Sequence, residues 1–282
     1  MQRLESIGIA GLGIALSLVV SACDPAAGTG SVVVGITGEE AATEGLPFEE
    51  DGEVIAFADG WSVTFDHYLA VVGALQVGDD VDDATYIVDL AKLGGDPPGA
   101  ELFTFEGLAA GQQPFSFAMP AANADSVVVG EADAALVQQM RDDGLTYYVA
   151  GAATKDGRTV TFEYPLTTAT TNSDCTNGDD DKQGVTVEAG VTADAEITIH
   201  IEHLFYDTLG VEGPDLVFDP LAASAAADDD DLTAEELGSL TVDAASYDKG
   251  SFDVTTMLDY IAVAASSQAH LNGEGLCTVT RR

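Results

Sequence analysis

Alternation of apolar and polar residues is the feature that most restricts how this 282-residue chain can fold. In WSVTFDHYL, Trp61, Val63 and Phe65 alternate with polar residues. A period of two gives a β-strand one buried and one exposed face. Similar short segments follow between turn residues: TYIVDLAKL, LFTFEGL, QPFSFAMPA, LTYYVAGAAT, RTVTFEYPL and AEITIHIEHLFYD. This spacing predicts a mainly β fold, and we expect an antiparallel β-sandwich over residues 51–207.

Turn and helix signals add detail to this frame. Asp156-Gly157, between two alternating segments, predicts a β-hairpin. Residues 131–141 carry apolar side chains at helical spacing and stop before Gly144, which predicts a short helix.

The pattern changes after residue 207. The stretch DLVFDPLAASAAADDDDLTAEELGSL indicates two short helices around an acidic loop. A further helix is expected with Asp253 as its N-cap and Asn272-Gly273 as its stop, which places His270 in its last turn. We therefore expect residues 208–282 to form a helical C-terminal portion packed on the sandwich.

The N-terminus contains a secretion signal. Ile7 to Val20 is an apolar run of 14 residues, too short to cross a hydrocarbon core of about 30 Å and typical of a signal peptide. Val20-Ser21-Ala22-Cys23 follows directly and resembles the lipobox of bacterial lipoproteins. The resemblance implies that residues 1–22 are removed and that Cys23 is acylated. The alternative is an ordinary secretory signal with a stray cysteine.

The segment 23–50 is rich in Gly, Ala, Thr and Glu, and we interpret it as a flexible tether after the acylated cysteine. Its one apolar island, SVVVGI, is available as an added edge strand. The resemblance thus implies an extracytoplasmic lipoprotein anchored to a membrane, in the periplasm or at the cell surface, with the leaflet left open.

Cysteine usage fits this location. Cys175 and Cys277 remain after Cys23 is set aside, and an even pair in an oxidising compartment predicts a disulfide. Closing a loop of about 100 residues would contribute up to ~4.7 kcal/mol in the chain-entropy model. The alternative is two free thiols that serve as metal ligands.

The charge limits the partners. Forty-nine acidic residues against nine basic ones give a net charge of −40. Binding to nucleic acid requires a basic surface, so nucleic acid is excluded as a partner. The same charge disfavours lying flat on anionic lipid, which leaves the N-terminal lipid anchor as the expected membrane contact. The charge itself fits adaptation to salt, simple solubility or loading with divalent cations, and it does not identify a protein partner.

The stretch ITIHIEHLFYD contains two of the four histidines. In a regular strand His200 and His203 point to opposite faces, so they meet only at a bulge or a strand end. Two histidines and a carboxylate within four residues form a usable ligand set for Cu, Zn or Fe. The disulfide would bring His270 close to them. The predicted metal ligands are His200, His203, His270 and Asp207. The alternative is one exposed histidine and one buried, hydrogen-bonded histidine.

A second acidic stretch, residues 229–237, resembles the back half of an EF-hand calcium loop. With Glu236 at the last ligand position, alanines occupy two earlier ligand positions, so the motif is broken. The possible calcium ligands are Asp229, Asp231 and Glu236. The alternative is a solvated turn in which Thr233 and Glu236 form a helix capping box.

Catalytic motifs are lacking in the sequence. There is no G-x-S-x-G, H-E-x-x-H, Walker loop or G-x-G-x-x-G after a strand, and we expect no enzyme. Asp89, within an apolar strand, is expected to have a hydrogen-bonded structural role. We interpret the chain as a lipid-anchored extracytoplasmic protein that binds a metal ion. The alternative is a structural or adhesive surface module with a salt-adapted acidic surface, and a hydrolase is the third choice.

Overall fold

The computed structural model describes residues 28–50, 52–211, 213–225 and 229–282. Over these residues the fold is mainly β with several short helices, as the alternating pattern predicts. The predicted signal peptide and Cys23 lie outside the described residues. No helix in the described part of the chain is long and apolar enough to cross a membrane.

A smaller sheet contains four of the described strands, in the order β16-β14-β1-β6. Their bounds are β1 (Thr29–Thr37), β6 (Ala100–Ala109), β14 (Thr192–Ile199) and β16 (Ala269–Leu271). Strand β1 lies between β14, which is parallel to it, and β6, which is antiparallel. Val32, Val34 and Ile36 are fully buried. Residues 29–37 are therefore an interior strand and not part of a tether, which the sequence does not reveal because both partners, β6 and β14, lie far away along the chain.

A larger sheet contains nine of the described strands, with the path β15-β11-β10-β4-β8-β12-β17 and a branch from β4 through β5 to β9. The strands are β4 (Ser62–Val77), β5 (Asp80–Asp89), β8 (Phe115–Met119), β9 (Val127–Val129), β10 (Tyr147–Lys155), β11 (Arg158–Leu166), β12 (Thr170–Ser173), β15 (Asp231–Leu232) and β17 (Thr278–Arg281). The β5–β9 and β11–β15 pairs are parallel. Both sheets are thus mixed rather than antiparallel, because alternation predicts a strand but not the direction of its partner.

Two further strand pairs lie outside these sheets: β2 (Phe48–Glu50) with β3 (Glu53–Ile55), and β7 (Gly111–Gln113) with β13 (Val185–Val187). The predicted hairpin at Asp156-Gly157 is confirmed, since Lys155 pairs with Arg158 across the β10–β11 turn. Asp156 and Gly157 have φ values of 52° and 84°, as this tight hairpin turn requires.

The helices are short. They are α1 (Glu39–Glu44), η1 (Leu90–Lys92), α2 (Ala134–Asp143), η2 (Ile201–Phe205), α3 (Asp219–Ala225), α4 (Ala234–Ser239), α5 (Val242–Ala245) and α6 (Met257–Ala265). The predicted helix over 131–141 is confirmed as α2. Helix α6 is capped by Thr256 rather than Asp253, because Thr256 accepts from the Asp259 N–H and Asp259 accepts in return. It ends at Ala265, so His270 lies in β16 and not in a helix.

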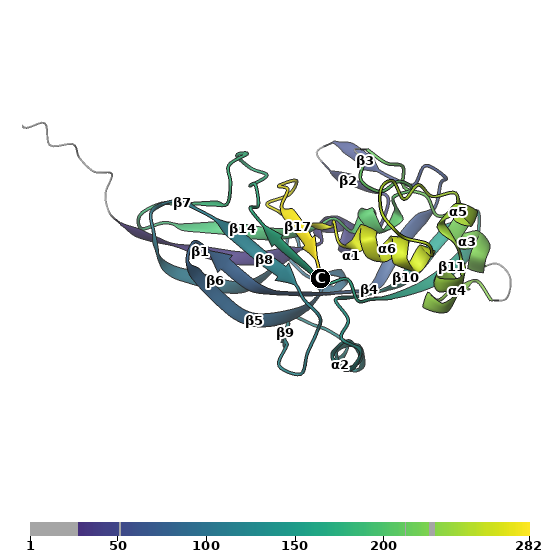
Figure 1. The fold of residues 1–282 in the computed structure, drawn as a ribbon, viewed down its shortest axis with the longest axis horizontal. Coiled ribbons are helices and arrows are strands. Elements are labelled where there is room, and N and C mark those ends of the chain that lie inside the picture. The colour runs from purple at the N-terminus through teal and green to yellow at the C-terminus, as the bar shows by residue number, and fades with distance from the viewer. Residues whose placement is uncertain (1–27, 51, 212, 226–228) are drawn as a thin grey trace, which may run out of the picture.

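The C-terminal portion, 208–282, has mixed content. Helices α3 to α6 gather at one end of the molecule, beside β10 and β11 (Figure 1). The same portion also supplies β16, which belongs to the smaller sheet, and β15 and β17, which belong to the larger sheet. It is therefore built into the β-structure rather than packed on it as a separate helical unit.

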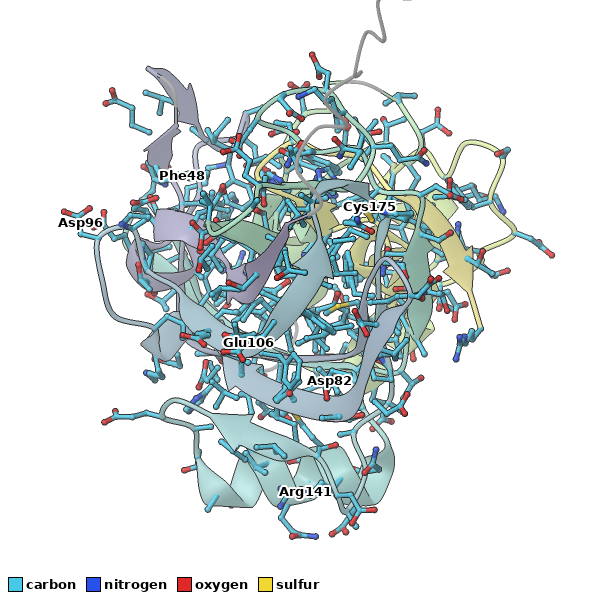
Figure 2. The ribbon with its side chains drawn as sticks, turned by 90° about the vertical axis from the view of Figure 1, so that its left-hand side faces the viewer. Phe48, Asp82, Asp96, Glu106, Arg141 and Cys175 are labelled. Carbon is cyan, nitrogen blue, oxygen red and sulfur yellow. A yellow bond between two sulfur atoms is a disulfide. The ribbon has the colours of Figure 1, made fainter. Side chains whose placement is uncertain are left out.

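Two hydrophobic clusters hold these layers together. The larger combines inward side chains of both sheets with the C-terminal helices, for example Ile197, Tyr68 and Ile261. The smaller lies beneath α2 and includes Val137 and Met140. Figure 2 shows Cys175, a member of the larger cluster, on the opposite side of the molecule from Arg141 of α2.

The predicted disulfide is confirmed. Cys175, which is fully buried, is bonded to Cys277 across a sequence separation of 102 residues. The bond joins the segment after β12 to the segment just before β17. The disulfide therefore fixes the chain directly after β16, the strand that contains His270.

Candidate metal centre

His200 and His203 lie where strand β14 ends. The strand stops at Ile199 and the short 3₁₀-helix η2 follows. Ile201, Leu204 and Phe205 of η2 are buried, at a helical spacing that replaces the alternation of the strand. Side chains three residues apart share one side of a 3₁₀-helix. The two imidazole rings are accordingly near each other, with centroids 5.7 Å apart and planes 20° apart.

Sheet pairing adds the third histidine. Strand β16 is antiparallel to β14, with His270 opposite Thr198. Ala269 and Leu271 face the core, and alternation places His270 on the same side as His200. The ring centroid of His270 lies 4.5 Å from that of His200. His200, His203 and His270 are called the histidine cluster below.

A left-handed turn after β16 positions a carboxylate. Asn272 and Gly273 have φ values of 50° and 70°. Asn272 is fixed to the backbone of Glu196, since its N–H donates to the Glu196 carbonyl at 2.8 Å and its Oδ1 accepts the Glu196 N–H at 2.7 Å. The turn brings Glu274 back toward β16, where its Oε2 lies 3.9 Å from Nδ1 of His270.

Three side chains can converge on one ion. Ligand atoms of His200, His270 and Glu274 all lie within 4.8 Å of one another. No other set of three or more His, Cys, Asp or Glu side chains meets this condition in the described part of the chain. Two imidazoles and a carboxylate are suitable ligands for Zn, Cu or Fe.

His270 is a neutral imidazole with a free lone pair. Its Nε2 lies 3.2 Å from the carbonyl oxygen of Ser267, and because a carbonyl only accepts, Nε2 carries the hydrogen. Burial and the nearby His200 lower the pKa of His270 to about 3. Nδ1 therefore carries a lone pair, and this nitrogen is buried without a hydrogen-bond partner among the described residues.

His203 is fixed by the same serine. The Ser267 hydroxyl donates to the Ala264 carbonyl at 2.8 Å, so it accepts from Nδ1 of His203 at 3.1 Å. The lone pair of His203 is then on Nε2, which lies 3.8 Å from Oε1 of Glu202. Burial lowers the pKa of His203 to about 4, so this ring is neutral as well.

His200 is the charged member of the cluster. Its Nε2 donates to the Gly273 carbonyl at 3.2 Å, and its Nδ1 faces Oε1 of Glu202 at 3.4 Å. Burial disfavours the charge on His200, but the Glu202 carboxylate outweighs burial and raises the pKa of His200 to about 9. Burial also acts to raise the pKa of Glu202, and the His200 charge holds that pKa below its usual value. Each of the two ring nitrogens of His200 therefore carries a proton.

Asp207 is not part of this group. It follows η2, and its Oδ1 accepts the Asp215 N–H at 3.2 Å. The sequence predicted a strand through residue 207, but β14 ends at Ile199 and η2 follows, so Asp207 does not share a strand face with the histidines. Glu274 is the candidate ligand that sequence reasoning missed, and its only signal was its place four residues after His270, just beyond Asn-Gly.

The acidic segment 229–236 uses its carboxylates internally. Asp229 accepts the Asp231 N–H at 3.1 Å, and Asp231 accepts the Thr161 hydroxyl at 2.7 Å. Thr233 and Glu236 form a complete capping box for α4, as the alternative to calcium binding predicted. Among the described residues, Asp229, Asp231 and Glu236 do not form a metal-capable group.

The fourth histidine lies elsewhere. His67 on β4 contacts the buried carboxylate of Asp89 through Nδ1 at 2.8 Å, and Asp89 also accepts the Tyr68 N–H at 2.9 Å. The expected hydrogen-bonded structural role of Asp89 is confirmed. Tyr68 faces the larger core cluster, so His67 points to the opposite side of the strand.

Comparisons with protein family models, with curated proteins and with solved structures each found no match to this chain. The geometry of its own residues therefore carries the functional argument.

Proposed function

We propose that this protein is a non-catalytic, lipid-anchored extracytoplasmic protein that binds one transition metal ion through His200, His270 and Glu274. The observation that carries the proposal is the Nδ1 lone pair of His270. It is buried, unpartnered among the described residues and 3.9 Å from a carboxylate oxygen. Leaving a buried polar atom unpaired costs about 1–3 kcal/mol, and a bound ion would remove this cost.

The surroundings of the ligands support the same conclusion. Metal-binding histidines usually donate their second N–H to a carbonyl or carboxylate, which fixes the tautomer and the ring. His270 donates to the Ser267 carbonyl, and His200 faces the Glu202 carboxylate. The ion would replace the proton on Nε2 of His200 and would displace its hydrogen bond to the Gly273 carbonyl.

The composition of the ligand set favours a transition metal over calcium. Calcium takes six to eight oxygen ligands, whereas this group offers two imidazole nitrogens and one carboxylate. Zn²⁺, Cu²⁺ and Fe²⁺ all accept such a set.

The cellular location rests on two supports. The disulfide between Cys175 and Cys277 is typical of an oxidising compartment outside the cytoplasm. The lipobox-like sequence ending at Cys23 supports a lipid anchor, although Cys23 lies outside the described residues.

Equilibrium dialysis against Zn²⁺, Cu²⁺ or Fe²⁺, followed by elemental analysis, tests the proposal. We expect about one equivalent of metal in the purified protein and loss of that metal in His200→Ala and His270→Ala. The matched control is His67→Ala, which removes the fourth histidine and should retain the metal. A protein that remains folded and binds none of these ions would refute the proposal.

A further inference from the structure

A hollow of about 290 Å³ borders the metal centre. Two carboxylates line it. One is Glu274, which together with His200 and His270 is called the metal group below, and the other is Glu202, which faces His200. The opposite walls come from the β2–β3 hairpin and from residues 213–216. Val54, Ile55 and Leu216 contribute apolar side chains to these walls beside Asp215, and Val54 is 66% exposed at the rim.

Glu202 lines this hollow and carries an unused hydrogen-bond acceptor. The residue is only 8% exposed, and its Oε1 is occupied by His200. Its other oxygen, Oε2, is buried without a hydrogen-bond partner in the described part of the chain. A buried carboxylate oxygen of this kind favours a molecule that brings an N–H or O–H group.

The metal group leaves room for such a molecule. His200, His270 and Glu274 supply three ligands, and an ion with three protein ligands keeps at least one coordination position for water or an added ligand. Glu274 is shared by the metal group and the hollow, so a molecule in the hollow would lie beside an ion held by Glu274.

We infer that the bound metal takes a small exogenous nitrogen ligand in this hollow. This inference rests on the proposed metal site. The ligand class is a compact heterocycle or amine with three features: a nitrogen lone pair for the metal, an N–H for Oε2 of Glu202, and a small apolar body against Val54 and Ile55. Imidazole is a simple heterocycle with the first two features.

Two probes test the hydrogen bond without changing the site. Imidazole and 1-methylimidazole both coordinate through one nitrogen, but only imidazole retains an N–H after coordination. Each is titrated into the Cu²⁺-loaded protein and followed by electron paramagnetic resonance and visible absorption. We expect imidazole to bind about tenfold more tightly, as one charge-assisted hydrogen bond implies. Equal affinities would overturn the inference.

Two substitutions test the hollow. Val54→Trp should fill it and weaken imidazole binding about tenfold or more, while Val54→Ala, a milder change at the same residue, should leave binding within a few-fold. Val127→Trp, at a valine of β9 that is also exposed and does not line the hollow, is the matched control. Unchanged imidazole binding in Val54→Trp would show that the ligand reaches the metal by another route.

The failures of the two proposals can be told apart. Copper content is measured before any probe is added. A protein that takes up no copper refutes the metal site itself, and the inference falls with it. A protein that holds copper but shows no spectral change with imidazole refutes only the open position.

Discussion

The histidine cluster and the acidic segment 229–236 offer metal-ligating side chains in comparable density, yet the fold treats them differently. In the acidic segment the carboxylates cap a helix, fix a turn and hold β15. In the histidine cluster the outer hydrogen bonds fix the rings and leave the Nδ1 lone pair of His270 without a partner among the described residues. The difference teaches that a ligand set is recognised by its unpaired atoms, and that residue types alone do not reveal it.

The strongest test of this contrast is His270→Ala. Binding of zinc to structural sites with four protein ligands releases about 10–16 kcal/mol, so each ligand of such a site accounts for roughly two to three orders of magnitude in affinity. We expect a loss of that size, measured by competition with a chromogenic chelator. The double variant Asp229→Asn, Glu236→Gln should bind metal as the wild type does. Equal losses in both variants would abolish the distinction between the two regions.

The pH dependence of metal affinity is the second test. His200 holds a proton up to a pKa of about 9 in the metal-free protein, and the metal must displace it. Affinity should therefore fall about tenfold for each pH unit below 9, or about a hundredfold from pH 9 to pH 7. His203 and His270 have pKa values of about 4 and 3, so they add nothing in this range. A flat profile measured by calorimetry would contradict the role of His200 as a ligand.

Ser267→Ala separates the two ways in which one serine holds two histidines. The substitution removes the hydroxyl that accepts from His203 and retains the carbonyl that accepts from His270. Nitrogen chemical shifts should show mixed tautomers for His203 and an unchanged tautomer for His270. Metal affinity should stay within a few-fold, because His203 is not a ligand of the proposed site and the outer hydrogen bond of His270 is retained. Ser267→Thr should restore the single tautomer of His203.

The smallest effect is expected in the acidic segment. Thr233→Ala removes one half of the α4 capping box and should lower the free energy of unfolding by about 1 kcal/mol. Denaturant unfolding measures this change. Metal affinity should remain the same, whereas Thr233→Ser should preserve stability. A change in metal affinity in Thr233→Ala would show that the two regions are coupled.

The sequence carried the local part of this structure. Alternation around Trp61 predicted strands, Asp156-Gly157 predicted a hairpin, and the pairing of Cys175 with Cys277 followed from cysteine count. Each of these signals is local or follows from elimination. The burial of residues 29–37 was missed because it depends on two partners far along the chain, β6 and β14, and the local pattern of a strand does not identify its partners.

The candidate site divides in the same way. His200 and His203 could be recognised together because Ile201, Leu204 and Phe205 change from strand to helical spacing just where a strand end is needed. The contribution of Glu274 could not be recognised, since it depends on the β14–β16 register and on a turn fixed by Glu196. The sequence instead favoured Asp207, which is close to the histidines along the chain but not in space.

The pairing of β16 with β14 also determines what a shortened chain can do. A chain that ends at β14 contains His200 and His203 but neither His270 nor Glu274. The proposed ion could be held only once residues 269–274 have docked on β14. The proposed metal capture is therefore a late step of folding, and a chain that is cut before this point would lack the site.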